Sequence, residues 1–578
     1  MKIASNLSRV ICALTAIVLC GETHLAVSQN INGTPIRIDV DTSGNPPPMA
    51  WPAMTLSGCF IAPAAHFGGR SISRDGEFVL FGTNCPMDPT DTNGDVDLYL
   101  FSRTLGRTEL VSRTWNGAAS GMCGSASISG DGRFIAYTCF APDVLPPNYP
   151  TAHGRLYLLD RALNYVVPID ITPNGGAPNG SAGGGSFPHV SADGNYVVFA
   201  CSSPNLLPVN TPPIILAIMR WSRMTGNLEV VNLAVDGSFV PNPYAIHDSI
   251  SADGQRVLFR GFAFQYINLP QANPTTPHVF VRDMVAGTTT LVSTDQDGVL
   301  SSFFYNKHLI SEDGNRILFS GGQWASVPVS LTQPNWTYEK NLTTGAVRPI
   351  GLGAPNTVGF SGYSGNDTTE RSISVIYTEA PSMLPGSSDP ESYAVFTKTG
   401  RFFRPAELPD GTPISQTAPL SNIIGTIAGA TICENGRWAL IQSNWDEFPI
   451  YMLPLPIADP VTEGYSASYP APFLNVKPPE GGLSVAYARW CPPSQPGYLA
   501  MTLNATASVV SLAGGGVSAV IPYGSAMSIQ SDAQGLVKLP FPWPSVLTGH
   551  VVHAQMAMVD PSAPAGYVLT DTVRLQLP

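Results

Sequence analysis

The pattern of apolar and polar positions is dominated by one hairpin that recurs along the chain. Each copy has a short apolar strand, a Ser-x-Asp-Gly turn, and a run of β-branched and aromatic residues leaving the turn. Five copies lie about sixty residues apart: SISRDGEFVLF, SISGDGRFIAY, HVSADGNYVVF, SISADGQRVLF and LISEDGNRILF. A sixth copy, ERSISVIY, lacks the Asp-Gly pair, and a seventh, TICENGRWALI, has Asn435-Gly436 in the turn. A repeat of this length predicts a repeated all-β unit.

The turn residues have a structural explanation. Asp-Gly is typical of tight hairpins in which both central residues take positive φ. We therefore interpret the turn aspartates as structural residues and expect none of them to be catalytic. They are Asp75, Asp131, Asp193, Asp253 and Asp313.

Two further strand-like runs separate the hairpins, such as DLYLFSR and TELVSR after the first. Four strands per repeat are typical of a propeller blade. The seventh repeat runs through FPIYMLPLP without an outer strand, and TPIRIDVDTSG holds the matching place before the first hairpin. We therefore predict an all-β fold, a seven-bladed β-propeller over residues 29–456, closed by an N-terminal strand at residues 36–40 that removes exposed sheet edges.

A different pattern follows the propeller. Residues 457–482 are rich in Pro, Gly and Ser and are interpreted as a linker. Residues 483–578 contain alternating segments such as LSVAYARW and TVRLQLP, with no segment of helical period. This pattern predicts a small C-terminal β-sandwich.

The hairpins and the strands that follow them, such as HVFVRD and TTLVST, resemble the WD40-like repeats of the TolB-type propeller family over about residues 34–460. The resemblance implies a propeller. It does not imply one activity, because the family includes peptide-binding periplasmic proteins, accessory domains of enzymes and other exported proteins. The stretch beginning HVVHAQMAMV is similar to C-terminal β-domains of exported proteins from environmental bacteria.

The first residues predict export. Lys2 and Arg9 precede the apolar run VICALTAIVLCG, and small residues end at Ser28, so residues 1–28 are interpreted as a signal peptide. The run is short for a transmembrane anchor, and we expect a secreted or periplasmic protein without one. Seven cysteines lie beyond this segment, which predicts disulfides and at least one unpaired thiol. The formal net charge of −12, without a basic tract, argues against nucleic-acid partners.

Three histidines precede hairpin turns, on strands expected to line the channel: His189, His247 and His308. Alternation along a strand predicts that His189 and His247 face alike and that His308 faces away unless a bulge intervenes. Oligogalacturonate lyases resemble this arrangement, since they are propellers with a histidine-held divalent metal in the channel. The chain has no basic cluster for a uronate substrate, so scattered polar residues in a wet channel remain the other interpretation.

An acidic stretch, MDPTDTNGDVDLY, offers oxygen ligands at Asp91, Asn93, Asp95 and Asp97. Such ligands suit calcium. The register is not that of an EF-hand, because Val96 stands where the glycine of the sharp turn belongs. The stretch is either a calcium site or a solvated loop between blades.

Aromatic residues near the fifth repeat could bind a ligand or pack between blades: Phe303, Phe304, Tyr305, Trp324 and Trp336. A serine hydrolase is disfavoured, because GFSGYSG lacks the spacing of a nucleophile elbow. We therefore expect an exported, non-catalytic binding or scaffold protein that needs no cofactor. Its partner would be an envelope or extracellular protein, a peptide or a glycan, engaged at the channel mouth or loops. A metal-dependent polysaccharide lyase is the alternative.

Overall fold

The computed structural model describes part of the chain, in two units. The described residues are 36–45, 61–63, 70–147, 155–172, 175–176, 178–179, 188–207, 217–240, 246–262, 266–267, 277–295, 297–300, 308–321, 336–349, 373–378, 391–396, 401–403, 429–433, 437–442, 450–454, 459–462, 473–480, 483–489, 491–503, 508–511, 517–520, 525–533, 535–542, 550–561, 567–570 and 572–576. One unit comprises Ile36–Val395 and Ile423–Met452, and the other includes Leu453–Pro578. The predicted signal peptide, residues 1–28, lies outside the described residues.

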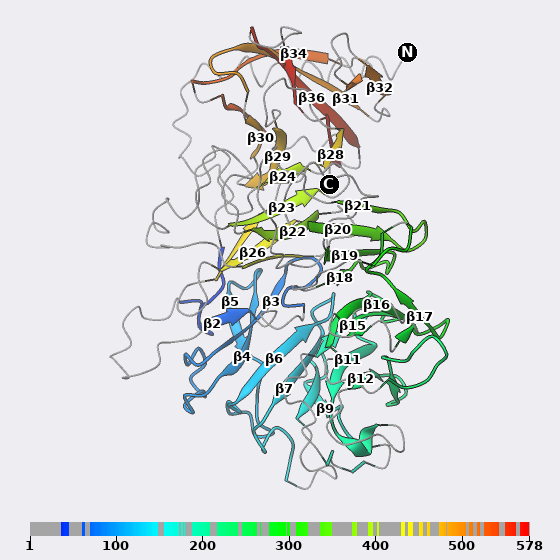
Figure 1. Cartoon of the computed structure of the whole chain (residues 1–578). Coiled ribbons are helices and arrows are strands. Elements are labelled where there is room, and N and C mark those ends of the chain that lie inside the picture. Colours follow the sequence, from blue (N-terminus) through cyan, green and yellow to red (C-terminus); the bar gives the residue numbers. More distant parts are fainter. Residues whose placement is uncertain are drawn as a thin grey trace, which may run out of the picture. The chain divides into compact units, whose positions relative to one another are not determined.

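The first unit consists of antiparallel sheets that follow one another along the sequence, from blue through green to yellow in Figure 1. The first blade is β2 (Ile61–Pro63), β3 (Phe78–Thr83), β4 (Asp97–Ser102) and β5 (Arg107–Leu110); the second is β6 (Cys123–Ile128), β7 (Phe134–Cys139), β8 (Leu156–Asp160) and β9 (Tyr165–Pro168). The third is β10 (His189–Val190), β11 (Tyr196–Cys201), β12 (Ala217–Ser222) and β13 (Leu228–Val230); the fourth is β14 (Ile246–Ile250), β15 (Arg256–Phe262), β16 (Pro277–Asp283) and β17 (Thr288–Leu291).

The later sheets repeat this order. The fifth blade is β18 (Leu309–Ile310), β19 (Arg316–Gly321), β20 (Trp336–Asn341) and β21 (Val347–Pro349), and the sixth is β22 (Ile373–Thr378), β23 (Glu391–Phe396) and β24 (Arg401–Phe403). The last is β25 (Gly429–Ile432), β26 (Trp438–Gln442) and β27 (Ile450–Pro454), with β1 (Ile36–Arg37) as its outer strand. The protein is therefore an all-β propeller, and the total number of blades in the ring stays a prediction.

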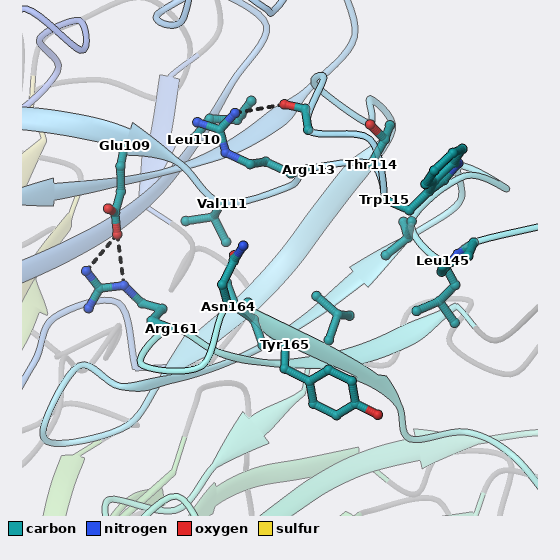
Figure 2. Close-up of a pocket in the computed structure, with 15 residues that line it drawn as sticks. Glu109, Leu110, Val111, Arg113, Thr114, Trp115, Leu145, Arg161, Asn164 and Tyr165 are labelled. Carbon is teal, nitrogen blue, oxygen red and sulfur yellow. Dashed lines mark hydrogen bonds and ion pairs between the residues drawn. The ribbon is translucent and has the colours of Figure 1, made fainter. Parts of the chain in front are cut away.

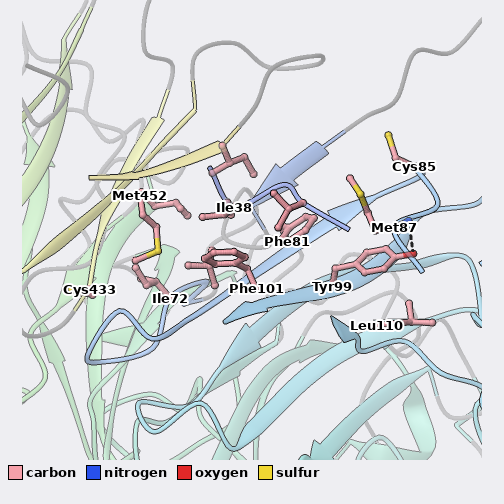
Figure 3. Packing of buried hydrophobic residues seen from close by; sticks show 14 residues of the cluster. Ile38, Ile72, Phe81, Cys85, Met87, Tyr99, Phe101, Leu110, Cys433 and Met452 are labelled. Atoms are coloured by element: carbon pink, nitrogen blue, oxygen red, sulfur yellow. Dashed lines mark hydrogen bonds between the residues drawn. The ribbon is translucent and has the colours of Figure 1, made fainter. Parts of the chain in front are cut away.

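The N-terminal strand closes the propeller as predicted. β1 pairs antiparallel with β27, with Ile36 opposite Met452, and the amide of Ile38 extends the ladder to the carbonyl of Ile450 at 3.0 Å. Ile38 and Met452 are buried in one cluster with Phe101 of the first blade (Figure 3). This apolar contact stabilises the junction between the last blade and the first.

The hairpin turns differ from the expectation in one respect. Gly132 has φ +72°, but none of the turn aspartates has positive φ. The Asp131 carboxylate instead accepts hydrogen bonds from the Ser129 hydroxyl at 2.5 Å and the Arg133 amide at 2.9 Å. The expected turn with two positive-φ residues is therefore wrong: the aspartate locks the turn by hydrogen bonds, and the glycine alone takes the left-handed conformation.

These inner turns also join neighbouring blades. A Cβ added to Gly132 would lie 2.3 Å from the ring of Phe78 in the preceding blade, and one on Gly76 would lie 2.6 Å from Trp438 of the last blade. Arg161 donates to the carbonyl of Gly132 at 2.6 Å and stacks over Phe78, 4.4 Å from its centroid. The turn glycines met by a side chain of the preceding blade are Gly76, Gly132, Gly194, Gly254 and Gly314, and we call them the inner ring.

The second unit is a sandwich of two sheets, in agreement with the prediction. One sheet contains β28 (Asp459–Thr462), β31 (Pro496–Leu503), β34 (Ser525–Gln530), β36 (Val551–Val559), β37 (Tyr567–Leu569) and β38 (Thr572–Gln576). The other contains β29 (Phe473–Glu480), β30 (Leu483–Arg489) and β35 (Val537–Pro542), and β32 (Ser508–Ser511) forms a hairpin with β33 (Val517–Val520). Leu474, Ala488 and Met556 share the core between the two sheets.

The segment interpreted as a linker, residues 457–482, differs from that expectation because it contains β28 and β29. β29 carries Pro478 and Pro479 where its register shifts, which hid its alternating pattern in the sequence. Cys123 and Cys139 form a disulfide in the propeller, whereas Cys201, Cys433 and Cys491 are buried thiols. Among the described residues, no helix has the length and apolar character needed to span a membrane.

Candidate binding site

The channel histidines occupy places in the inner strands that the register defines. His189 lies opposite Val198, the same ladder place that Ser127 and Ser249 hold in the second and fourth blades. The hydroxyls of these two serines accept hydrogen bonds of 2.8 Å from the backbone amides of Val190 and Ile310 in the next blade. This place in the strand therefore has a structural use, which is to tie adjacent inner strands together.

The other two histidines do not share that place. The ladder of β14 shifts between His247 and Ser249, and Leu309, next to His308, takes the place that His189 has in the third blade. Such a shift was the condition under which the simple alternation would fail. His189 and His308 are both buried, and the side chain of His247 lies outside the described residues. Within the described part of the chain, no group of three or more His, Cys, Asp or Glu side chains could hold a metal.

The acidic stretch is a hydrogen-bonded loop between β3 and β4. Asp97 accepts hydrogen bonds from the Ser112 hydroxyl at 2.5 Å, the Gly121 amide at 3.0 Å and the Asn93 amide group at 2.9 Å. Asp91 accepts one from the Tyr99 hydroxyl at 2.5 Å, and burial raises the pKa of Asp91. Asp95 is exposed, and its backbone amide donates to Asn93. These bonds give the loop a structural role, and calcium binding there stays a prediction.

The aromatic candidates of the fifth blade fall, wholly or at the side chain, beyond the part of the chain that the structure describes. Phe303, Phe304, Tyr305 and Trp324 lie outside the described residues, as does the side chain of Trp336 on β20.

A second set of turns, at the outer side of the blades, points to another candidate. After the outer strands β1, β5 and β13, the chain makes a four-residue turn ending in a positive-φ glycine before it enters the next blade. Residues 41–44, 114–117 and 234–237 are such turns, each closed by a bond of 2.9 or 3.0 Å from the glycine amide to the carbonyl of the first turn residue. We call these the outer turns. Their second residues are Thr42, Trp115 and Val235, and only one of them is aromatic.

Trp115 borders a groove of about 450 Å³ between the first and second blades. β5, the outer turn 114–117, residues 144–146 and the β8–β9 hairpin line it. Trp115 and Tyr165 are each 53% exposed, although both are large and apolar. Figure 2 shows Glu109 and Arg161 at one end of the groove and Trp115 and Leu145 at the other, with Asn164 and Tyr165 between them.

The charges in the groove are paired. Arg161 binds the Glu109 carboxylate at 2.6 Å, joining the second blade to the outer strand of the first. Arg113 lies 3.3 Å from Asp88 and donates to the carbonyl of Gly117 at 2.8 Å. The Asp88 pKa is lowered, because hydrogen bonds from Thr90 and the charge of Arg113 outweigh the opposing effect of burial. The groove therefore combines exposed aromatic faces with polar groups whose charges are compensated.

The sequence interpretation did not include this groove. Trp115 and Tyr165 are fifty residues apart in the sequence, and neither lies in the repeated Ser-x-Asp-Gly hairpin. Aligning the outer turns with one another would have identified Trp115, since DTSG, TWNG and AVDG hold the same place in the repeat.

Comparison with known proteins gives distant structural likenesses. No family model matches the chain, and no curated protein matches it. A prolyl endopeptidase structure is 11% identical, with 75% of this chain and 54% of that chain covered and a TM-score of 0.39. An oligogalacturonate lyase from Vibrio parahaemolyticus is 12% identical, with 73% and 98% covered and a TM-score of 0.31.

A further similar structure is that of a putative TolB from Agrobacterium tumefaciens, 13% identical, with 50% of this chain and 87% of that chain covered and a TM-score of 0.27. This chain spans about half the length of the prolyl endopeptidase that it resembles. The assignment to the β-propeller fold rests on the strand order and on the closure by β1 described above.

Proposed function

We propose that the chain is an exported, non-catalytic binding module of TolB type, in which the propeller holds a protein, peptide or glycan at its blade loops. One observation carries this proposal: Trp115 and Tyr165 are exposed aromatic residues that border an open groove between two blades. Large apolar side chains at such a site favour contact with a ligand.

The polar residues support the same proposal. The turn aspartates, the acidic loop and the inner-strand serines each form hydrogen bonds that hold the fold together. A carboxylate or hydroxyl that already forms hydrogen bonds within the scaffold has fewer donors and lone pairs left for a substrate. The disulfide between Cys123 and Cys139 agrees with a destination in an oxidising compartment.

An array of glycans and peptides tests the proposal. The purified mature protein is applied with and without EDTA, and bound polymers are recovered and sized. We expect binding that persists in EDTA and leaves the polymer at its original length. Shortened uronate polymers, or stoichiometric manganese or zinc that is lost in His189→Ala, would support a metal-dependent lyase and overturn the proposal. Absence of binding to every glycan and peptide, together with the recovery of no protein partner from an envelope extract, would also contradict it.

A further inference from the structure

We propose that the groove between the first and second blades binds a neutral oligosaccharide, whose sugar rings stack on Trp115 and Tyr165. This inference rests on the proposed function and narrows it to one site and one class of ligand. It comes from comparing equivalent positions in successive blades, which is a comparison that only a repeat protein allows.

The outer turn does not require an aromatic residue at the position of Trp115. Thr42 and Val235 hold the same place in turns with the same glycine bond and a similar positive φ at the glycine. In all three turns, the backbone amide of this residue donates a hydrogen bond to a carbonyl in the loop between the second and third strands of the next blade. The pairs are Thr42 with Met87, Trp115 with Asp143 and Val235 with Tyr266. The indole adds nothing to that bond, so its exposed face is available to a ligand.

Tyr165 gives the same result independently. It begins the outer strand β9 opposite Asp160, and the equivalent residues are Arg107 opposite Ser102 in the first blade and Thr288 opposite Asp283 in the fourth. An arginine or a threonine therefore suffices for this place in the blade. Two aromatic residues thus depart from the repeat at the same junction, and both line the same groove.

The charges select a neutral ligand. Glu109 is paired with Arg161, and Arg113 is paired with Asp88, so no unpaired charge among these four groups favours an anionic or a cationic partner. An ionic ligand would have to break one of these pairs or bury a charge without a partner. A neutral ligand leaves both pairs intact.

The polar groups suit hydroxyls. The guanidinium of Arg161 donates, the half-exposed Glu109 carboxylate accepts, and the exposed Asn164 side chain does both. A sugar hydroxyl also donates and accepts, so a sugar can satisfy all three. A peptide added as a strand has less to bind, because β9 is four residues long and ends in Pro168, which has no N–H.

Titration calorimetry of the mature protein tests this inference. The probes are neutral hexasaccharides of β-1,4-linked glucose, xylose, mannose and N-acetylglucosamine, with hexagalacturonate as an anionic probe and decaproline as a peptide probe. We expect at least one neutral hexasaccharide to bind. Trp115→Ala and Tyr165→Ala should each weaken it about tenfold, which is about 1.4 kcal/mol for a lost stacking contact. Trp115→Phe should weaken it less, because a smaller aromatic face remains.

Val235→Ala is the matched control, since Val235 is 57% exposed at the equivalent outer turn of another junction. It should leave the affinity unchanged, and thermal melting should show that all variants fold. If sugars bind equally well to Trp115→Ala and Tyr165→Ala, or only hexagalacturonate or decaproline binds, the inference is wrong while the binding function stands. If no probe binds, and the wider array and the envelope extract are also negative, both proposals fail.

Discussion

The inner ring and the outer turns are both sets of glycine-containing turns repeated from blade to blade, yet they differ in how freely their side chains vary. At the inner ring, a side chain of the preceding blade covers each glycine, and an arginine binds the glycine carbonyl. At two of the three outer turns, a Cβ added to Gly117 or Gly237 would meet nothing within 4 Å, whereas one on Gly44 would lie 2.9 Å from the Gly106 carbonyl oxygen. The second residue of these turns is Thr, Trp or Val.

The difference indicates which positions of a repeat can acquire a function without disturbing the fold. A position packed against the next blade must keep its residue, because a change disturbs two blades at once. A position with a free side chain can change without cost to the fold. A departure from the repeat is therefore most informative where packing does not explain it, as at Trp115.

The comparison is tested most strongly by alanine at one glycine of each set. Gly132→Ala should lower the free energy of unfolding by about 3 kcal/mol, because it combines left-handed strain with a clash against Phe78. Gly117→Ala should cost only the strain, about 1 kcal/mol. Urea denaturation measures both. Equal losses would show that contact between blades does not distinguish the two sets.

A second test uses the buried carboxyl group of Asp170 and the dependence of stability on pH. Asp170 is fully buried, accepts hydrogen bonds from the amides of Arg155 and Leu156, and has a pKa raised by burial to about 6. Because the folded protein favours the protonated form, its contribution to the free energy of unfolding should fall by about 2 to 3 kcal/mol as pH rises from about 4 to about 6, and stay low above that.

Asp170→Asn should remove this slope. Asn232 in the third blade shows that an amide can serve in the matching place, since its carbonyl oxygen accepts the Ile218 amide at 2.9 Å. The measurement is urea denaturation of both proteins across this pH range. The hypothesis fails if the difference between the two proteins does not change between pH 4 and pH 6.

Arg161 connects the inner ring to the groove, because it binds the Gly132 carbonyl and also Glu109 in the groove. Arg161→Met should cost about 1 to 2 kcal/mol through the lost inner-ring contact and its stacking on Phe78. Glu109→Gln, its matched control, should cost less than about 0.5 kcal/mol, since Glu109 is half exposed. Denaturation of both variants decides this, and a larger loss for Glu109→Gln would reverse the ranking.

The sequence predicted the architecture because short local patterns of residues identify each blade. Ser-x-Asp-Gly, the alternating runs, and the missing outer strand of the last repeat were enough to predict that residues 36–40 complete the last blade, where Ile36 pairs with Met452. Cys433 shows how strict the pattern is: it stands where Ser73 stands in the first copy, and its sulfur accepts the Trp438 amide as the serine oxygen accepts the Phe78 amide.

The candidate site could not be predicted in the same way, because it arises between blades. The groove depends on the distance between Trp115 and Tyr165, which no local pattern encodes. The positive φ expected for the turn aspartates was wrong, because Asp-Gly alone does not show that the hydroxyl of the serine two residues earlier donates to the aspartate carboxylate. The arginines that follow the third strands, Arg103, Arg161 and Arg223, were a visible signal whose partners became apparent only in the structure.

The pairing of β1 with β27 has a consequence for how the protein matures. β1 can pair with β27 only after the end of the propeller sequence has been synthesised. Until then the first blade lacks the last blade as its neighbour. If the chain crosses a membrane N-terminus first, the ring cannot close until the last blade has also crossed. Closure of the ring would then require that the whole propeller sequence has been translocated.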